Sequence, residues 1–114
     1  MTPMSWATPD SQATVFKALA DPTRRQILRH LRDGDLSAGE ITGRFSISAP
    51  SISRHLSVLK AAGLVTVRRD ANRIYYSLRA DRLAASVGSF LSAVCPEVGP
   101  RGRLRANASP EGAA

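Results

Sequence analysis

The chain has 114 residues, the length of one domain, and can bury a modest core without metals or disulfides. Sixteen Lys and Arg residues against nine Asp and Glu residues give a formal net charge of +7. Residues 44–82 hold eight of the basic and two of the acidic residues. This local excess suits a polyanion such as nucleic acid, although a solvated basic face is equally open.

The cellular context follows from cysteine content and hydropathy. Cys95 is the only cysteine, so an intrachain disulfide framework is excluded and a reducing cytoplasm is favoured. The first residues lack the basic start and apolar run of a secretory signal. The uncharged stretch of residues 83–95 is too short to span a bilayer. We therefore expect a cytoplasmic protein that has no membrane contact.

Two helices are predicted in the N-terminal part. Residues 1–10 contain two prolines and small polar residues, so we expect them to be flexible. Residues 11–20 carry apolar side chains at helical spacing and predict a first helix. Asp21 is a suitable N-cap and Pro22 a suitable first residue for a second helix that ends near Arg32. Its inward side chains are Ile27, Leu28 and Leu31.

A short capped helix and a longer one follow. Ser37 and Glu40 have the spacing of a capping box, which starts a third helix that ends near Arg44. In the next helix Ser48 is the predicted N-cap, and Gly63 stands where the helix ends. Its core-facing residues are Ile52, Leu56 and Leu59, and its outward ones are Pro50, Arg54, Ser57 and Ala61. Such a pair, joined by a short turn, is typical of a helix-turn-helix.

A β-hairpin is predicted after this helix. Residues 64–68 and 73–78 alternate between apolar and polar side chains, and residues 70–72 separate them. If the apolar positions face the helices, Arg68, Arg69 and Arg73 cluster at the exposed tip. The expected fold class is therefore mainly α with a two-stranded β-hairpin, a winged helix-turn-helix.

The last predicted helix, residues 80–94, has an apolar stripe that is large for so small a domain to cover by itself. Pairing with a second copy through the first and last helices would give a two-fold homodimer. Residues 96–114 have few apolar side chains and are expected to be disordered, so the folded domain should span residues 11–95. The expected dimer interface consists of Val15, Phe16, Leu19, Leu83, Val87, Phe90, Leu91 and Val94.

The order of these elements is accompanied by two motifs, Ala20-Asp21-Pro22-Thr23-Arg24 and Ser53-Arg54-His55-Leu56-Ser57-Val58-Leu59. Over about residues 12–94 the chain thereby resembles the ArsR family of bacterial transcriptional repressors. The resemblance implies a winged helix-turn-helix homodimer, dimerised by its first and last helices, that binds an operator with two-fold symmetry.

The resemblance does not extend to the family's sensing motifs. Metal-sensing members carry Cys-x-Cys-Asp-Leu where this chain has Ser37 to Ile41. Other members bind zinc through Asp and His residues of the last helix, where this chain offers only Asp81. Sulfur-sensing members pair two cysteines, and this chain has one. We therefore expect no metal and no cofactor.

Candidate DNA contacts lie on the predicted recognition helix and on the hairpin tip. An arginine on such a helix can bind guanine bidentately in the major groove, and wing arginines can follow phosphates or enter a minor groove. His55 flanks the apolar stripe, so a structural role and a DNA contact are both open. For Arg24 and Arg25, pairing with Glu40 or solvent is favoured over DNA contact. The candidates are Ser48, Ser51, Ser53, Arg54, His55 and Ser57 on the helix, and Arg68, Arg69, Asn72 and Arg73 on the wing.

These features predict a sequence-specific transcriptional regulator that binds double-stranded DNA, a homodimeric repressor of a two-fold symmetric operator. Two alternatives remain open. One is a winged-helix module that binds another protein, and the other is the same repressor controlled by an effector at the dimer interface. An enzyme is not expected, because Ser51 or Ser53 with His55 lacks an acid partner and an oxyanion site.

Overall fold

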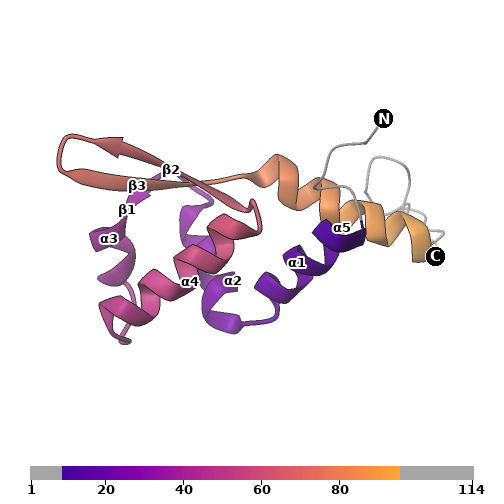
Figure 1. The fold of residues 1–114 in the computed structure, drawn as a ribbon, viewed down its shortest axis with the longest axis horizontal. Coiled ribbons are helices and arrows are strands. Elements are labelled where there is room, and N and C mark those ends of the chain that lie inside the picture. Colours follow the sequence, from indigo (N-terminus) through magenta and orange to yellow (C-terminus); the bar gives the residue numbers. More distant parts are fainter. Residues whose placement is uncertain (1–8, 96–114) are drawn as a thin grey trace, which may run out of the picture.

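The computed structural model describes residues 9–95, which form five helices and a three-stranded antiparallel sheet (Figure 1). Residues 1–8 and 96–114 lie outside the described part, and with them most of the expected flexible start and the expected disordered tail. Within the described residues, no helix is long and apolar enough to cross a membrane. The elements are α1 (Pro9–Leu19), α2 (Pro22–Leu31), β1 (Leu36–Ser37), α3 (Ala38–Thr42), α4 (Ala49–Ala61), β2 (Val65–Asp70), β3 (Arg73–Leu78) and α5 (Ala80–Val94).

The predicted helix starts are confirmed by their caps. Asp21 Oδ1 accepts the backbone N–H of Thr23 at 2.7 Å and opens α2. Ser37 Oγ accepts the N–H of Glu40 at 3.1 Å, while Glu40 Oε1 accepts the N–H of Ser37 at 2.8 Å, which completes the capping box of α3. Ser48 is the N-cap of α4. Each cap satisfies backbone donors that the first turn of a helix leaves without a partner.

The sheet has one strand more than the expected hairpin. β1 pairs antiparallel with β3, with Leu36 opposite Tyr76 and Ser37 opposite Tyr75, and the strand order is β1-β3-β2. The predicted hairpin is confirmed as β2 and β3, and β1 is a third strand that the sequence did not indicate. A strand of two residues is too short to show alternation, and its second residue, Ser37, is also the N-cap of α3.

One apolar core joins the helices to the base of the hairpin. The inward faces predicted for the second and fourth helices are buried, and residues of α1, of α3 and of the segment after α4 complete the cluster. Its members are Val15, Ala18, Ile27, Leu28, Leu31, Ile41, Ile52, Leu56, Leu59, Ala62, Leu64 and Val65.

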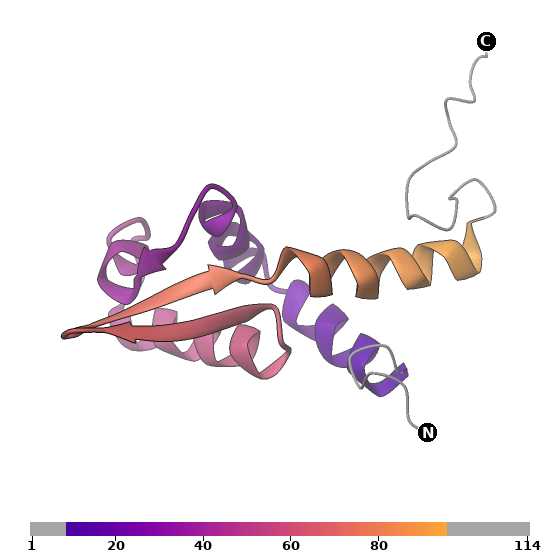
Figure 2. The same cartoon turned by 90° about the horizontal axis from the view of Figure 1, so that it is seen from above.

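The described residues divide into two regions at opposite ends of the molecule. The first, here called the head, runs from α2 to β3 and contains the helix-turn-helix and the hairpin. The second, the stem, is formed by α1 and α5, which lie side by side in both views (Figures 1 and 2). The start of α4 and the hairpin tip both lie at the end away from the stem (Figures 1 and 2).

Gly63 lies where head and stem meet. Its φ of +78° is a left-handed conformation that favours glycine, as predicted for the end of this helix. A Cβ at this position would overlap the side chain of Arg82 in α5. The backbone after α4 is therefore covered directly by a stem arginine.

Candidate nucleic-acid interface

The first turn of α4 holds a short chain of polar contacts. Ser48 Oγ accepts the backbone N–H of Ser51 at 3.3 Å and donates its own hydrogen to Ser51 Oγ at 3.1 Å. Arg54 Nη2 donates to the same Ser51 Oγ at 3.5 Å. The guanidinium therefore lies near the helix N-terminus, where the macrodipole also favours an anion.

All the candidate residues of the recognition helix lie on α4 or its cap. Ser48, Ser53, Arg54 and Ser57 are exposed. Ser51 and His55 are half-buried at the flank. Ser53 lies on the side that faces α3, where it lines a hollow together with Thr42. The exposed face combines one cation with several hydroxyl groups, a composition that can bind phosphates and base edges.

His55 has a partner that the sequence did not indicate. Its Nδ1 lies 3.3 Å from Arg24 Nη1. The same guanidinium donates from Nε to the carbonyl of Ala18 at 2.7 Å and from Nη2 to that of Lys17 at 3.1 Å. Neighbouring Arg25 donates to the carbonyl of Leu19 at 2.7 Å.

Of the two expectations for Arg24 and Arg25, pairing with Glu40 is wrong, whereas contact with solvent holds for Arg25, which is exposed. Both arginines bind carbonyls at the end of α1, and Glu40 is the partner of Ser37. Backbone carbonyls carry no signature in a sequence, so only the packing of α2 against α1 could reveal these contacts.

The wing arginines do not lie on a single face. The register pairs Arg68 with Tyr75 and Arg69 with Ile74, so Arg69 projects from the face opposite to Arg68. Arg68 lies 3.5 Å from Asp35 and 3.7 Å from Asp70, and its guanidinium lies 4.6 Å from the centre of the Tyr75 ring. Within residues 9–95, neither Arg69 nor Arg73 forms an ion pair, although the charge of Arg73 acts on the nearby Glu40 carboxyl. These two side chains are the wing cations that can still bind an anion.

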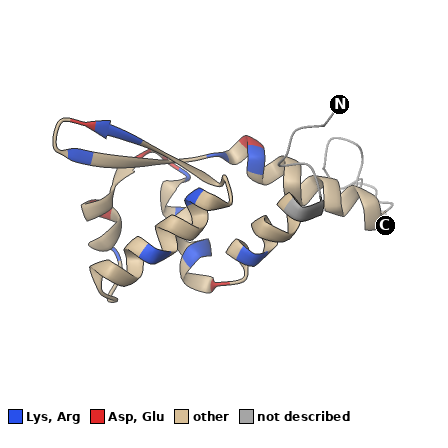
Figure 3. Cartoon of the chain, viewed as in Figure 1, with Lys and Arg blue, Asp and Glu red and all other residues tan. Residues whose placement is uncertain are grey.

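Basic residues recur along the wing, α4 and the helices behind it (Figure 3). All four wing candidates, Arg68, Arg69, Asn72 and Arg73, are exposed. The Asp35 contact of Arg68 is a feature that the hairpin pattern did not indicate, because Asp35 precedes β1 and reaches the hairpin only through the third strand.

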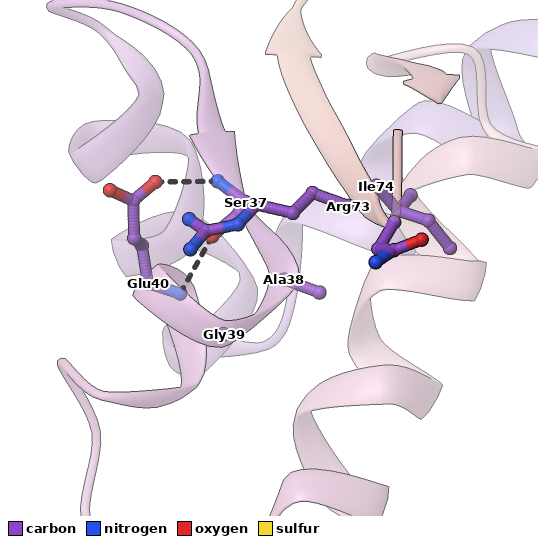
Figure 4. Close-up of a pocket in the computed structure, with 7 residues that line it drawn as sticks. Ser37, Ala38, Gly39, Glu40, Arg73 and Ile74 are labelled. Atoms are coloured by element: carbon purple, nitrogen blue, oxygen red, sulfur yellow. Dashed lines mark hydrogen bonds between the residues drawn. The ribbon is translucent and has the colours of Figure 1, made fainter. Parts of the chain in front are cut away.

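A hollow of about 500 Å³ lies between the start of α3 and the wing (Figure 4). The hydrogen bonds that Glu40 accepts from Ser37 lower the pKa of the Glu40 carboxyl, and the charge of Arg73 contributes in the same direction. Ser37 and Glu40, which line this hollow, thus form the N-terminal cap of α3. Among the described residues, no three His, Cys, Asp or Glu side chains come together as metal ligands would.

The stem has an apolar surface. Phe16 of α1 and Phe90 of α5 form an edge-to-face pair with ring centres 5.3 Å apart. Phe90 is 44% exposed and Val94 is 56% exposed. The other expected interface residues of the stem are half-buried, and two of them, Leu19 and Leu83, also pack against the core. The half-buried residues are Phe16, Leu19, Leu83, Val87 and Leu91.

Val15 differs from the other expected interface residues. It is 1% exposed and belongs to the core of its own chain, so it has almost no surface to offer a partner. Helical spacing placed it on the same face as Phe16 and Leu19 but could not tell which apolar residues of that face turn toward α5 and which toward the core.

In this chain α4 has an exposed polar face, packs against the short capped helix α3 that precedes it, and is followed by a hairpin. This arrangement defines a winged helix-turn-helix domain. Residues 19–68 match the model of a helix-turn-helix domain family. The chain is 49% identical over 78 residues to the transcriptional repressor SdpR of Bacillus subtilis, covering 68% of this chain and 87% of that protein. It is 35% identical over 83 residues to the biofilm growth-associated repressor of Agrobacterium fabrum, covering 73% and 71%.

The fold also resembles that of a solved structure. The ArsR-like transcriptional regulator from a Rhodococcus species has a TM-score of 0.69 and 33% identity, covering 77% of this chain and 82% of that one. The chain belongs to the ArsR family of helix-turn-helix transcriptional regulators. This confirms the resemblance and the predicted winged-helix class, and it assigns the chain to DNA-binding regulators, not enzymes.

Proposed function

We propose that the protein is a homodimeric repressor that binds a two-fold symmetric operator in double-stranded DNA and acts in the cytoplasm. The observation that carries this proposal is the separation of two surfaces. The polar face of α4 and the available wing cations lie at one end, and an unpartnered apolar stem lies at the other. Two related proteins are named repressors, which supports repression over activation.

In this proposal α4 enters the major groove. Arg54 reads a base edge, as a guanidinium held at 3.5 Å by Ser51 can donate two hydrogen bonds to guanine. Ser53 and Ser57 contribute hydroxyl groups from the same exposed face. The helix start at Ser48 and Ser51 approaches a phosphate, and His55 contacts the flank of the groove.

The wing contacts the DNA backbone next to the major groove that α4 enters. Arg69, Asn72 and Arg73 supply the phosphate or minor-groove contacts, since none of these side chains is engaged in an ion pair within the described residues. Arg68 contributes less, because Asp35 and Asp70 already offset part of its charge.

In the proposed homodimer, a second copy of the chain supplies the second recognition helix and wing. We propose that the partner packs on the exposed stem residues, which leaves Val15 out of the interface. Two recognition helices then read half-sites about 34–36 Å apart, one turn of DNA. The proposed interface consists of Phe16, Leu19, Leu83, Val87, Phe90, Leu91 and Val94. We expect no metal to be required.

The test is selection of bound fragments from genomic DNA, followed by competition between the selected site and a scrambled copy. Arg54→Ala should reduce discrimination against the wrong base, an interaction that contributes about 1–3 kcal/mol. Arg73→Ala should weaken all DNA alike and reduce the salt slope by about 1.

Arg32→Ala is the matched control, because Arg32 is an exposed arginine just after α2 whose loss changes the net charge equally. It should leave discrimination unchanged. If wild-type protein bound the selected and scrambled sites equally well, sequence-specific repression would be excluded. Added zinc, nickel or copper should not change operator affinity, and a large change would show that a metal effector exists.

A further inference from the structure

The side chain of Arg24 contacts two other helices. Arg24 lies in the first turn of α2, and its Nε and Nη2 donate to the carbonyls of Ala18 and Lys17 near the end of α1. Its Nη1 lies 3.3 Å from Nδ1 of His55 in the recognition helix. Stem and reading surface are therefore connected by one side chain.

The chemistry of this contact fixes the state of the histidine ring. A guanidinium has five N–H donors and no acceptor, so His55 Nδ1 must be the acceptor. A neutral imidazole that accepts at Nδ1 carries its hydrogen on Nε2. An imidazolium would have an N–H at Nδ1 and could not accept from Arg24.

Arg24 is held more firmly than the ring it contacts. Its bonds reach two carbonyls near the end of α1, that of Ala18 and that of Lys17, which also accepts the N–H of Ala20. The guanidinium cannot turn away without losing both. His55 also lies close enough to Asp21 for the two charges to interact, but the hydrogen bond at Nδ1 comes from Arg24, and this bond determines the ring's tautomer.

We propose that Arg24 is a positioning residue that presents His55 to DNA as a neutral Nε2–H donor for a phosphate oxygen. His55 lies on the flank of α4 and is half-buried, which suits the wall of the groove better than its floor. The DNA part of this proposal rests on the proposed function, whereas the tautomer is a property of the free protein.

The tautomer is measured first, by NMR of protein labelled with nitrogen-15 in histidine, without DNA. His55 should show a protonated Nε2 and an unprotonated Nδ1. Arg24→Met should release the ring into a mixture of both tautomers. A ring protonated at Nδ1 in the wild type, or one unchanged in Arg24→Met, would overturn the proposal.

The chain contains an internal reference for this measurement. His30 is the other histidine, and its Nδ1 lies 3.3 Å from Arg44 Nη1 in the same kind of contact. Arg24→Met should leave His30 unchanged, and Arg44→Met should alter His30 while leaving His55 unchanged. Altered signals from both rings in either variant would indicate a general loss of structure, in which case Arg24→Lys, which keeps the charge, repeats the measurement.

The DNA contact is tested by two amide substitutions at His55. A glutamine amide reaches the position of Nε2, whereas an asparagine amide reaches only that of Nδ1. His55→Asn should lose about tenfold in affinity for every DNA sequence, and His55→Gln should lose clearly less. The salt slope should stay unchanged in both, because a neutral donor releases no counterion. Equal losses in both variants, or a reduced slope, would exclude the neutral Nε2 donor.

A double-mutant cycle separates positioning from simple stabilisation. Arg24→Met should weaken DNA binding about threefold to tenfold in the wild-type background and much less in His55→Gln, whose amide has no tautomer to fix. Equal effects in both backgrounds would make Arg24 merely structural. If the wild type bound no operator specifically, the proposed function and the phosphate contact would both fail, while the free-protein tautomer would still stand or fall by NMR.

Discussion

The head and the stem differ in how much of their apolar surface one chain can cover. In the head, Ile41, Ile52 and Leu59 are almost fully buried among residues of the same chain. In the stem, Phe90 and Val94 remain 44% and 56% exposed. A single chain therefore suffices to build the surface that we propose reads DNA, but the spacing between two such surfaces requires a second copy.

The apolar core extends across the junction between the two regions. Val15 and Ala18 of α1 belong to it, and Arg82 over Gly63 and Arg24 on the carbonyls of α1 add further side-chain contacts between stem and head. Phe90 and Val94, the exposed stem residues, lie outside this core. Variants in the core should therefore unfold the head, and variants at the exposed stem residues should change the assembly of the protein.

Leu59→Ala should have the largest effect. Leu59 is fully buried in α4, and removal of a buried leucine side chain costs about 2–5 kcal/mol of unfolding free energy, including the cavity left behind. Urea denaturation measures this loss. Leu91→Ala in the stem is the matched control, measured in the Phe90→Asp background so that no partner covers Leu91; since Leu91 is half-buried in its own chain, its cost should be smaller. Equal costs would remove the distinction between the regions.

Phe90→Asp should dissociate the proposed dimer while the head stays folded. A charge on an exposed aromatic residue of the proposed apolar interface should cost about 2–4 kcal/mol of association free energy, as interface hot spots do. Light scattering should show the monomer, and circular dichroism should show unchanged helix content. If wild-type protein were already monomeric and dimerised only with another protein, the interaction-module interpretation would replace the homodimer.

Gly63→Ala tests the junction. Its left-handed backbone costs a non-glycine residue about 1–2 kcal/mol, and Arg82 must also move away from the new Cβ. Thermal unfolding should show the loss. Adding Arg82→Ala to Gly63→Ala should recover the share of the lost stability that is due to overlap with Arg82. Only the cost of the left-handed backbone should then remain. No recovery would mean that Arg82 does not cover this turn.

The sequence predicted what depends on neighbours along the chain and missed what depends on neighbours in space. Asp21, Ser37 and Ser48 were identified as caps because a cap acts within three residues. β1, the Arg24–His55 contact and the Arg68–Asp35 ion pair join segments far apart in the chain. No periodicity marks such contacts, so only the assembled fold reveals them.

Substitution of Ser48 should have the smallest effect on stability and separates the two roles proposed for the start of α4. Ser48→Ala removes the cap and should cost about 1 kcal/mol of unfolding free energy. Ser48→Asp keeps a capping oxygen and favours the helix dipole, so stability should be retained. The added negative charge should nevertheless weaken DNA binding by repelling the phosphate. If Ser48→Asp bound the operator as tightly as the wild type, no phosphate would approach this helix end, and α4 would read DNA with its outer face alone.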